Sequence, residues 1–138
     1  MEQRFGWTGK ILDIDLSTRR ITTLDTHAAS ERFIGGIGIG QKLYWDRMAG
    51  PRDAFAPDNP LILMTGPLAG STAPAAPRIS VCGKSPCVQP ETFVHASIGG
   101  FFPAELKRAG FDGIVLTGRA DKPLYLHISD DRVELRDA

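Results

Sequence analysis

Residues 61–86 read LILMTGPLAGSTAPAAPRISVCGKSP, and two short apolar runs in this stretch enclose a loop of small residues, glycine and proline. The runs LILMTG and RISVCGK have the length and the flanking residues of buried strands. The loop between them, called here the small-residue loop (residues 66–77), carries few long side chains, so another group can come close to its backbone. Arg78 follows the loop and enters the second strand, so we expect its guanidinium at one end of a sheet. Its planar fork suits a phosphate, while an ion pair with a nearby carboxylate is an equally open interpretation.

The rest of the chain predicts hairpins at both ends and helices between the strands. Seventeen residues from Gly9, GKILDIDLSTRRITTLD, alternate with period two around a polar turn, as does PLYLHISDDRVELRD near the end, with its turn at Asp130-Asp131. Helix is expected from about Ala28 to Met48 with an interruption at GGIGIG, and again in GGFFPAELKRAGF with Gly110 as the C′ residue. With the strand GIVLTG, this makes about seven strands and two or three helices, which predicts an α+β fold with a mixed sheet.

Size and composition are those of one soluble domain. The chain has 138 residues, of which 42% are hydrophobic and 23% charged, and its 16 basic and 16 acidic residues cancel. No net field therefore favours nucleic acid or an anionic membrane. The first residues lack an apolar signal-peptide core, and no apolar run reaches the ~18–20 residues of a membrane span. Together with only two cysteines, this predicts a cytoplasmic protein.

Common nucleotide, metal and catalytic motifs are absent or incomplete. GGIGIG does not place glycine at the positions of a dinucleotide fingerprint, and the phosphate-loop ending CGKS has Arg78 where the leading glycine is needed. Cys82 and Cys87 form no paired zinc motif, so we expect one buried cysteine and one loop cysteine. His95 and His127 have no partner at a suggestive spacing, and His127 is expected at the surface. No residue of the chain is predicted to be catalytic.

Several longer segments together resemble a known family. Five segments are similar, in this order, to the amino-terminal domain of tungsten-dependent aldehyde ferredoxin oxidoreductases. They are GWTGKILDIDLST, FIGGIGIGQKLYWDRM, the residues 61–86 quoted above, ASIGGFFPAELKRAGFDGIVLTGRADKPLY and the final VELRDA. The resemblance covers essentially the whole chain. It implies a single domain over residues 1–138, expected to be truncated relative to the family's domain, that forms a platform under a tungsten–bispterin cofactor (tungstopterin).

The resemblance also implies roles for individual residues. Arg78 falls on the family's arginine that holds a cofactor phosphate, and the small-residue loop would let the chain approach the flat pterin. Ser97 stands where many members have an asparagine that ligates a Mg²⁺ bridging the two pterin phosphates. Gly99 and Gly100 would bring backbone groups to the same phosphates. The implied cofactor-binding set is therefore Arg78, Ser97, Gly99 and Gly100, with Ser97 as the metal ligand.

The chain departs from the family pattern in two respects. Ile37 replaces an arginine of a GGRG-like turn. The segments GGIGIGQKLYWDRM and GGFFPAELK look closer to the active-site subunit of class II benzoyl-coenzyme A reductase. Cys82 and Cys87 match none of the family's [4Fe–4S] ligands, so the cluster is implied for the parent enzyme and its ligands are not expected in this chain.

The implied function is the platform portion of an enzyme that oxidises an aldehyde with water to a carboxylic acid and passes electrons to ferredoxin. The chain alone is not expected to be catalytically complete, so the remainder of the enzyme or a companion subunit is an expected partner. Two alternatives stay open: the corresponding part of a benzoyl-coenzyme A reductase-like subunit, and a non-catalytic docking module that forms a homodimer.

Overall fold

The computed structural model describes residues 5–48, 50 and 52–138 and has an α+β fold. The strands are β1 (Lys10–Asp15), β2 (Arg20–Asp25), β3 (Leu61–Thr65), β4 (Arg78–Ser85), β5 (Thr92–Gly99), β6 (Gly113–Thr117), β7 (Leu124–Ser129) and β8 (Arg132–Asp137). The helices are α1 (His27–Phe33), α2 (Ile37–Arg47) and α3 (Phe102–Arg108). In the described part of the chain, no helix has the length and apolar character needed to cross a bilayer.

The predicted mixed sheet is confirmed. Six strands lie in the order β2-β1-β6-β3-β4-β5, and β7 and β8 pair separately. β1 and β6 run parallel, whereas the other paired strands are antiparallel. In the β4–β5 pair, Arg78 lies opposite Gly99 and Ser80 lies opposite Ser97. The register therefore places the predicted site residues at one end of the outer two strands.

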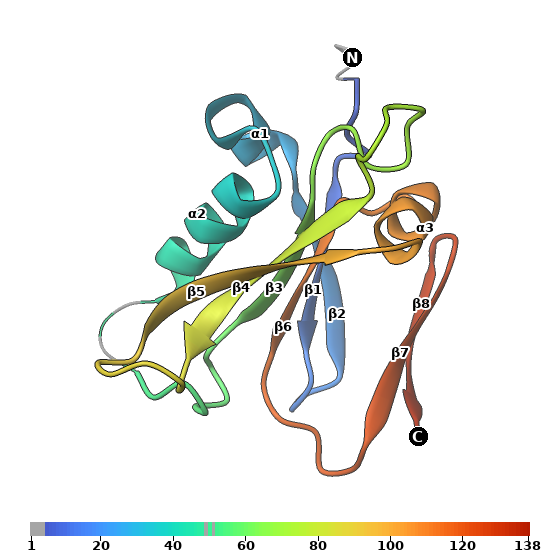
Figure 1. The fold of residues 1–138 in the computed structure, drawn as a ribbon. Coiled ribbons are helices and arrows are strands. Elements are labelled where there is room, and N and C mark those ends of the chain that lie inside the picture. Colours follow the sequence, from blue (N-terminus) through green and yellow to red (C-terminus); the bar gives the residue numbers. More distant parts are fainter. Residues whose placement is uncertain (1–4, 49, 51) are drawn as a thin grey trace.

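Helices and hairpin cover opposite faces of the sheet (Figure 1). Helices α1 and α2 lie on one face, and α3 lies with the β7–β8 hairpin on the other. Because successive strand residues point to alternate faces, Ile11 and Leu12 of β1 belong to different core clusters. The cluster beneath α2 comprises Ile11, Ile39, Tyr44, Ile62, Met64, Cys82 and Val115. The cluster beneath α3 and the hairpin comprises Leu12, Ile14, Ile79, Leu106, Phe111 and Ile114.

The helical region differs from the prediction in the position of its break. Helix α2 begins at Ile37, so most of GGIGIG is helical and the interruption is confined to residues 34–36. Gly40 lies where α2 packs closely on β4, since a Cβ at this position would come within 2.8 Å of Cys82 Sγ. This glycine therefore serves helix–sheet contact instead of ending the helix.

Strand β5 is not among the strands predicted from the sequence. It is an eight-residue edge strand whose side chains are mostly exposed. Its period-two pattern is limited to Val94, Ala96 and Ile98, and a polar residue precedes or follows each of them. An edge strand is held by its partner's backbone more than by burial, so its hydrophobic signal is weak.

Both terminal hairpins and the end of the third helix are confirmed. β1 pairs with β2 and β7 pairs with β8, and the second turn holds Asp130 at a φ of 51°. Gly110 has a φ of 90° and its amide donates to the Lys107 carbonyl at 3.0 Å. A left-handed glycine at this position is the expected C′ residue of α3.

Candidate functional site

Arg78 begins β4 at the point where the small-residue loop ends. Its guanidinium Nη1 donates a hydrogen bond to the Ser97 hydroxyl of β5 at 3.2 Å. Arg78 is exposed, and no carboxylate of the described residues forms an ion pair with it. Within this part of the chain, the ion-pair interpretation therefore finds no support, and the guanidinium is accessible to a ligand.

The glycines around Arg78 leave open space. A Cβ added to Gly66, Gly99 or Gly100 would meet no heavy atom of the described structure within 4 Å. Gly66 directly follows β3, and Gly99 lies opposite Arg78 in the β4–β5 pair. A group approaching this end of the sheet would therefore meet backbone and the Arg78 side chain.

The start of α2 lies beside the same strands. A Cβ on Gly36 would come within 3.2 Å of Ser80 Oγ, and Ser80 lies opposite Ser97. The Gly36 amide donates to the Thr65 carbonyl at 2.9 Å, which joins the turn before α2 to the end of β3. No acidic side chain occupies the first turn of α2, so no carboxylate there offsets the positive end of the helix dipole.

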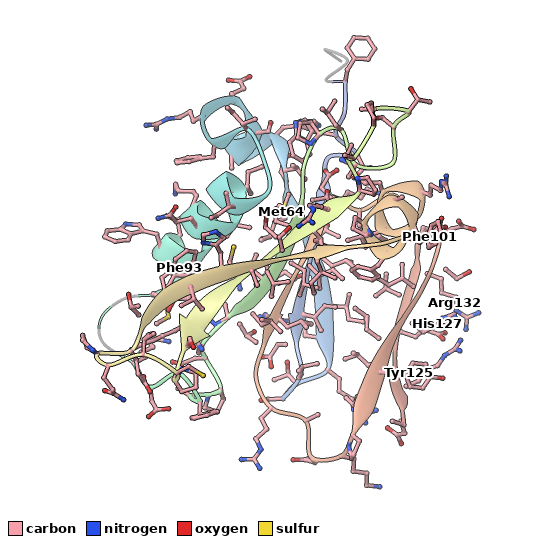
Figure 2. All side chains as sticks on the ribbon, viewed as in Figure 1. Met64, Phe93, Phe101, Tyr125, His127 and Arg132 are labelled. Carbon is pink, nitrogen blue, oxygen red and sulfur yellow. The ribbon has the colours of Figure 1, made fainter. Side chains whose placement is uncertain are left out.

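Two other residues singled out in the sequence, Ile37 and His127, add no charged group to this site. Ile37, the replacement for the implied arginine, is the first residue of α2 and is 37% exposed. Figure 2 shows His127 with Tyr125 and Arg132 on the side of the β7–β8 hairpin away from the sheet. His127 is half-buried and belongs to this separate two-stranded sheet, whereas Arg78 belongs to the six-stranded sheet.

The two cysteines lie where they were expected. Cys82 is buried in the cluster beneath α2, and burial raises the pKa of its thiol, while Cys87 is exposed after β4. Across residues 5–48, 50 and 52–138, no three His, Cys, Asp or Glu side chains gather as they would around a metal ion. The cysteines therefore behave as one core residue and one surface residue.

One charged group near the site was not predicted from the sequence. The Asp112 side chain is fully buried, and its carboxylate accepts hydrogen bonds from the amides of Thr8 (3.0 Å) and Gly9 (2.9 Å). It also accepts from the Thr26 hydroxyl at 2.7 Å and from the Lys107 ammonium at 2.6 Å. The signal in the sequence was a charged residue directly before the apolar strand β6. Burial alone would raise the pKa of Asp112, but the hydrogen bonds from Lys107 and Thr26 outweigh it and lower the pKa.

The lowered pKa of Asp112 predicts a loss of stability in acid. Its stabilising effect is full above the unfolded-state pKa of about 4 and disappears as the pH falls through the lower, folded-state pKa. We expect the free energy of unfolding to fall more steeply below about pH 5 in the unsubstituted chain than in Asp112→Asn. Denaturant titrations between pH 7 and pH 3 measure this difference, and equal slopes would contradict the assigned charge state.

The assembled residues suit an anion better than a cation. An exposed guanidinium, a neighbouring hydroxyl, open backbone and the start of α2 all favour negative charge. Ser97 offers one oxygen, so a Mg²⁺ at this hydroxyl would take most of its ligands from phosphate and water. The site thus fits a phosphate-bearing ligand.

Comparison with known proteins identifies the family. A family model described as the N-terminal domain of aldehyde ferredoxin oxidoreductase matches residues 11–138. The chain belongs to this family. Membership confirms the resemblance, and the α+β fold of the described residues is consistent with it.

Curated relatives of the aldehyde ferredoxin oxidoreductase family include tungsten-containing enzymes. A tungsten-containing aldehyde ferredoxin oxidoreductase of Pyrococcus horikoshii is 42% identical over 136 residues, which is 97% of this chain and 22% of the relative. An aliphatic sulfonate oxidoreductase, WOR-like subunit, of Pyrococcus furiosus is 33% identical over 138 residues, again 97% of this chain and 22% of the relative. The chain therefore spans about a fifth of the length of these relatives.

A solved structure has the same fold. The active-site complex BamBC of benzoyl-coenzyme A reductase, in complex with 1,5-dienoyl-CoA, contains a chain that superposes with a TM-score of 0.92 at 36% identity. The match covers 98% of this chain and 20% of that chain. The α+β architecture of this chain is thus shared with a chain of that complex.

Proposed function

We propose that this chain is the amino-terminal cofactor platform of a tungsten–bispterin oxidoreductase and that Arg78 binds a pterin phosphate. The observation that carries the proposal is the Arg78 guanidinium, exposed beside the Ser97 hydroxyl and bordered by open glycines. Tungsten-containing relatives at 42% identity support the choice of cofactor.

The residues of this chain would bind and orient the cofactor. Arg78 would pair with a phosphate through two parallel hydrogen bonds. Ser97 would supply a hydroxyl to the phosphate or to its Mg²⁺, and Gly99 and Gly100 would present backbone without side-chain obstruction. When bound, the tungsten–bispterin group supplies the two-electron redox chemistry.

The proposed reaction of the complete enzyme is the oxidation of an aldehyde with water to a carboxylic acid. This oxidation would release two electrons and two protons, and a [4Fe–4S] cluster held outside this chain would supply the electron route to ferredoxin. The cluster ligands and the acid–base groups would come from polypeptide beyond these 138 residues, either the remainder of the enzyme or a companion subunit. The match to 22% of the length of the relatives supports this division of labour.

Reduction of an aromatic coenzyme A thioester is the second candidate reaction. The TM-score of 0.92 with a benzoyl-coenzyme A reductase component favours it, because the same platform could serve either substrate. Assay of the complete enzyme with an aldehyde and with benzoyl-coenzyme A separates the two: turnover of the thioester alone would select the second reaction.

Exposed apolar side chains predict an interaction with further polypeptide. Val94, Ile98, Phe101 and Phe102 are 37%, 51%, 87% and 47% exposed, and Phe101 lies at the α3 end of β5 (Figure 2). Apolar side chains gathered in this way mark interaction surfaces. We expect the isolated chain to self-associate in size-exclusion chromatography, and a concentration-independent monomer would argue against the homodimeric docking module.

A substitution at Gly99 tests the platform proposal by steric exclusion. Because the space around Gly99 is open, Gly99→Val should change the free energy of unfolding by no more than about 0.5 kcal/mol. The added side chain should nevertheless exclude the cofactor, so tungsten and pterin content should fall. Thr92→Val, which places the same side chain at the other end of β5, is the matched control. Unchanged cofactor content in Gly99→Val would contradict the proposed approach to the glycines.

A further inference from the structure

Asp112 joins the first described segment of the chain to the end of β3. Its carboxylate accepts hydrogen bonds from the Thr8 and Gly9 amides of the chain's first described segment. Its backbone carbonyl accepts hydrogen bonds from the Thr65 amide at 2.9 Å and from the Thr65 hydroxyl at 2.6 Å. Thr65 is the last residue of β3 and directly precedes the small-residue loop. One buried residue therefore holds the backbone at residues 8–9 and at the end of β3.

Lys107 extends the same network to Trp7. The Lys107 ammonium donates to Asp112 at 2.6 Å and to the Gly6 carbonyl at 2.6 Å, and the side chain is only 8% exposed. The ammonium also lies 4.5 Å from the centroid of the Trp7 ring, within the range of a cation–π interaction. The small-residue loop passes over this side chain, since a Cβ on Gly70 would come within 3.3 Å of Lys107 Cβ.

Trp7 in turn holds the turn before α2. A Cβ on Gly35 would lie 2.6 Å from Trp7 Cη2 and 3.0 Å from Pro67 Cδ. A Cβ on Gly6 would lie 2.8 Å from the Pro67 carbonyl oxygen. The Trp7 ring and Pro67 are thus packed directly against the Gly35 backbone, with no room for a side chain. The Trp7 ring therefore limits how the turn and the loop can move relative to each other.

We propose that the buried Asp112–Lys107 pair, acting through Trp7 and Thr65, positions the small-residue loop and the turn at residues 34–36 around the candidate phosphate site. Asp112, Lys107 and Trp7 touch no ligand in this account and are positioning residues. The inference rests on the proposed cofactor site, because Arg78 follows the positioned loop directly.

The test removes the Trp7 ring and leaves the ion pair in place. In Trp7→Ala, hydrogen exchange should accelerate about tenfold or more at the amides that close this region, while exchange in β1 and β6 stays unchanged. The reporting amides are those of Gly36, Ala69 and Ser71, which donate to Thr65, Gly66 and Leu68. Trp7→Phe, which keeps an aromatic ring beside Lys107, should restore most of the protection. Trp45→Ala, at a tryptophan that is 79% exposed, is the matched control and should change none of these amides.

Cofactor content separates failure of this inference from failure of the proposed function. We expect tungsten and pterin per chain to fall in both Trp7→Ala and Arg78→Ala. Unchanged content in Arg78→Ala would overturn the cofactor site itself. A second outcome would overturn only the positioning role. In it, Arg78→Ala loses tungsten and pterin, while Trp7→Ala keeps both its cofactor content and its local hydrogen-exchange rates. Uniformly faster exchange across all strands in Trp7→Ala would likewise overturn it, because the ring would then serve global stability alone.

Discussion

Replacing Lys107 by methionine should lower the free energy of unfolding by about 3–5 kcal/mol, because it leaves the buried Asp112 carboxylate without its counter-charge. The side chains of this ion pair are 8% and 0% exposed, so water cannot replace the lost ammonium. Methionine keeps most of the aliphatic volume of lysine, which separates loss of charge from loss of packing. Urea unfolding at pH 7, followed by circular dichroism, measures the effect.

The next residue of the same helix provides the control. Arg108 pairs with Glu105, but their side chains are 68% and 59% exposed. Exposed pairs contribute little, so Arg108→Met should cost less than about 1 kcal/mol. A Lys107→Met cost as small as that of Arg108→Met would mean that the Asp112 carboxylate is compensated by its other donors.

Replacing Arg78 by alanine should weaken cofactor binding about 10- to 100-fold and leave stability nearly unchanged. A charge-assisted hydrogen bond contributes about 1.5–3 kcal/mol, which corresponds to this range. Stability should not change because the guanidinium is exposed and its one hydrogen bond in the described structure is to Ser97. Equilibrium dialysis of the pterin from the loaded enzyme measures the affinity. Arg78→Lys should give an intermediate value, since it keeps the charge and loses the two-bond geometry.

Arg119 offers a matched arginine at the opposite end of the sheet. Arg119 follows the end of β6 that pairs with Leu61, the first residue of β3. Arg78 lies beside Ile79, which pairs with Thr65, the last residue of β3. Arg119→Ala should leave pterin affinity unchanged. Equal affinity in Arg78→Ala and Arg119→Ala would show that the phosphate does not depend on Arg78.

The elements predicted correctly from sequence are those with local signals. Period-two alternation around polar turns predicts both terminal hairpins, and Gly110 predicts the end of α3. The glycines of GGIGIG were misleading, because Gly40 is set by contact with Cys82 across the α2–β4 interface. Such close packing is a tertiary cause that outweighs the intrinsic helix propensity of glycine.

The site required information that local patterns do not contain. Arg78 could be singled out because it follows a loop of small residues, but its role and that of Ser97 were implied by the family resemblance. Their contact depends on the β4–β5 register, in which the two residues are 19 apart in sequence. The buried network is still less local, since Thr26 and Asp112 are 86 residues apart. No periodicity or spacing links such residues before the chain folds.

The central claim is that this chain binds a tungsten–bispterin group at the Arg78 end of its sheet. The most direct measurement is the content of tungsten and pterin per chain after expression in a tungsten-fed host and purification in parallel with Arg78→Ala. We predict that both tungsten and pterin co-purify with the unsubstituted chain and are strongly reduced in Arg78→Ala, while circular dichroism shows the same fold for both. Absence of tungsten and pterin from the folded, unsubstituted chain, or equal amounts in the two proteins, would contradict this claim.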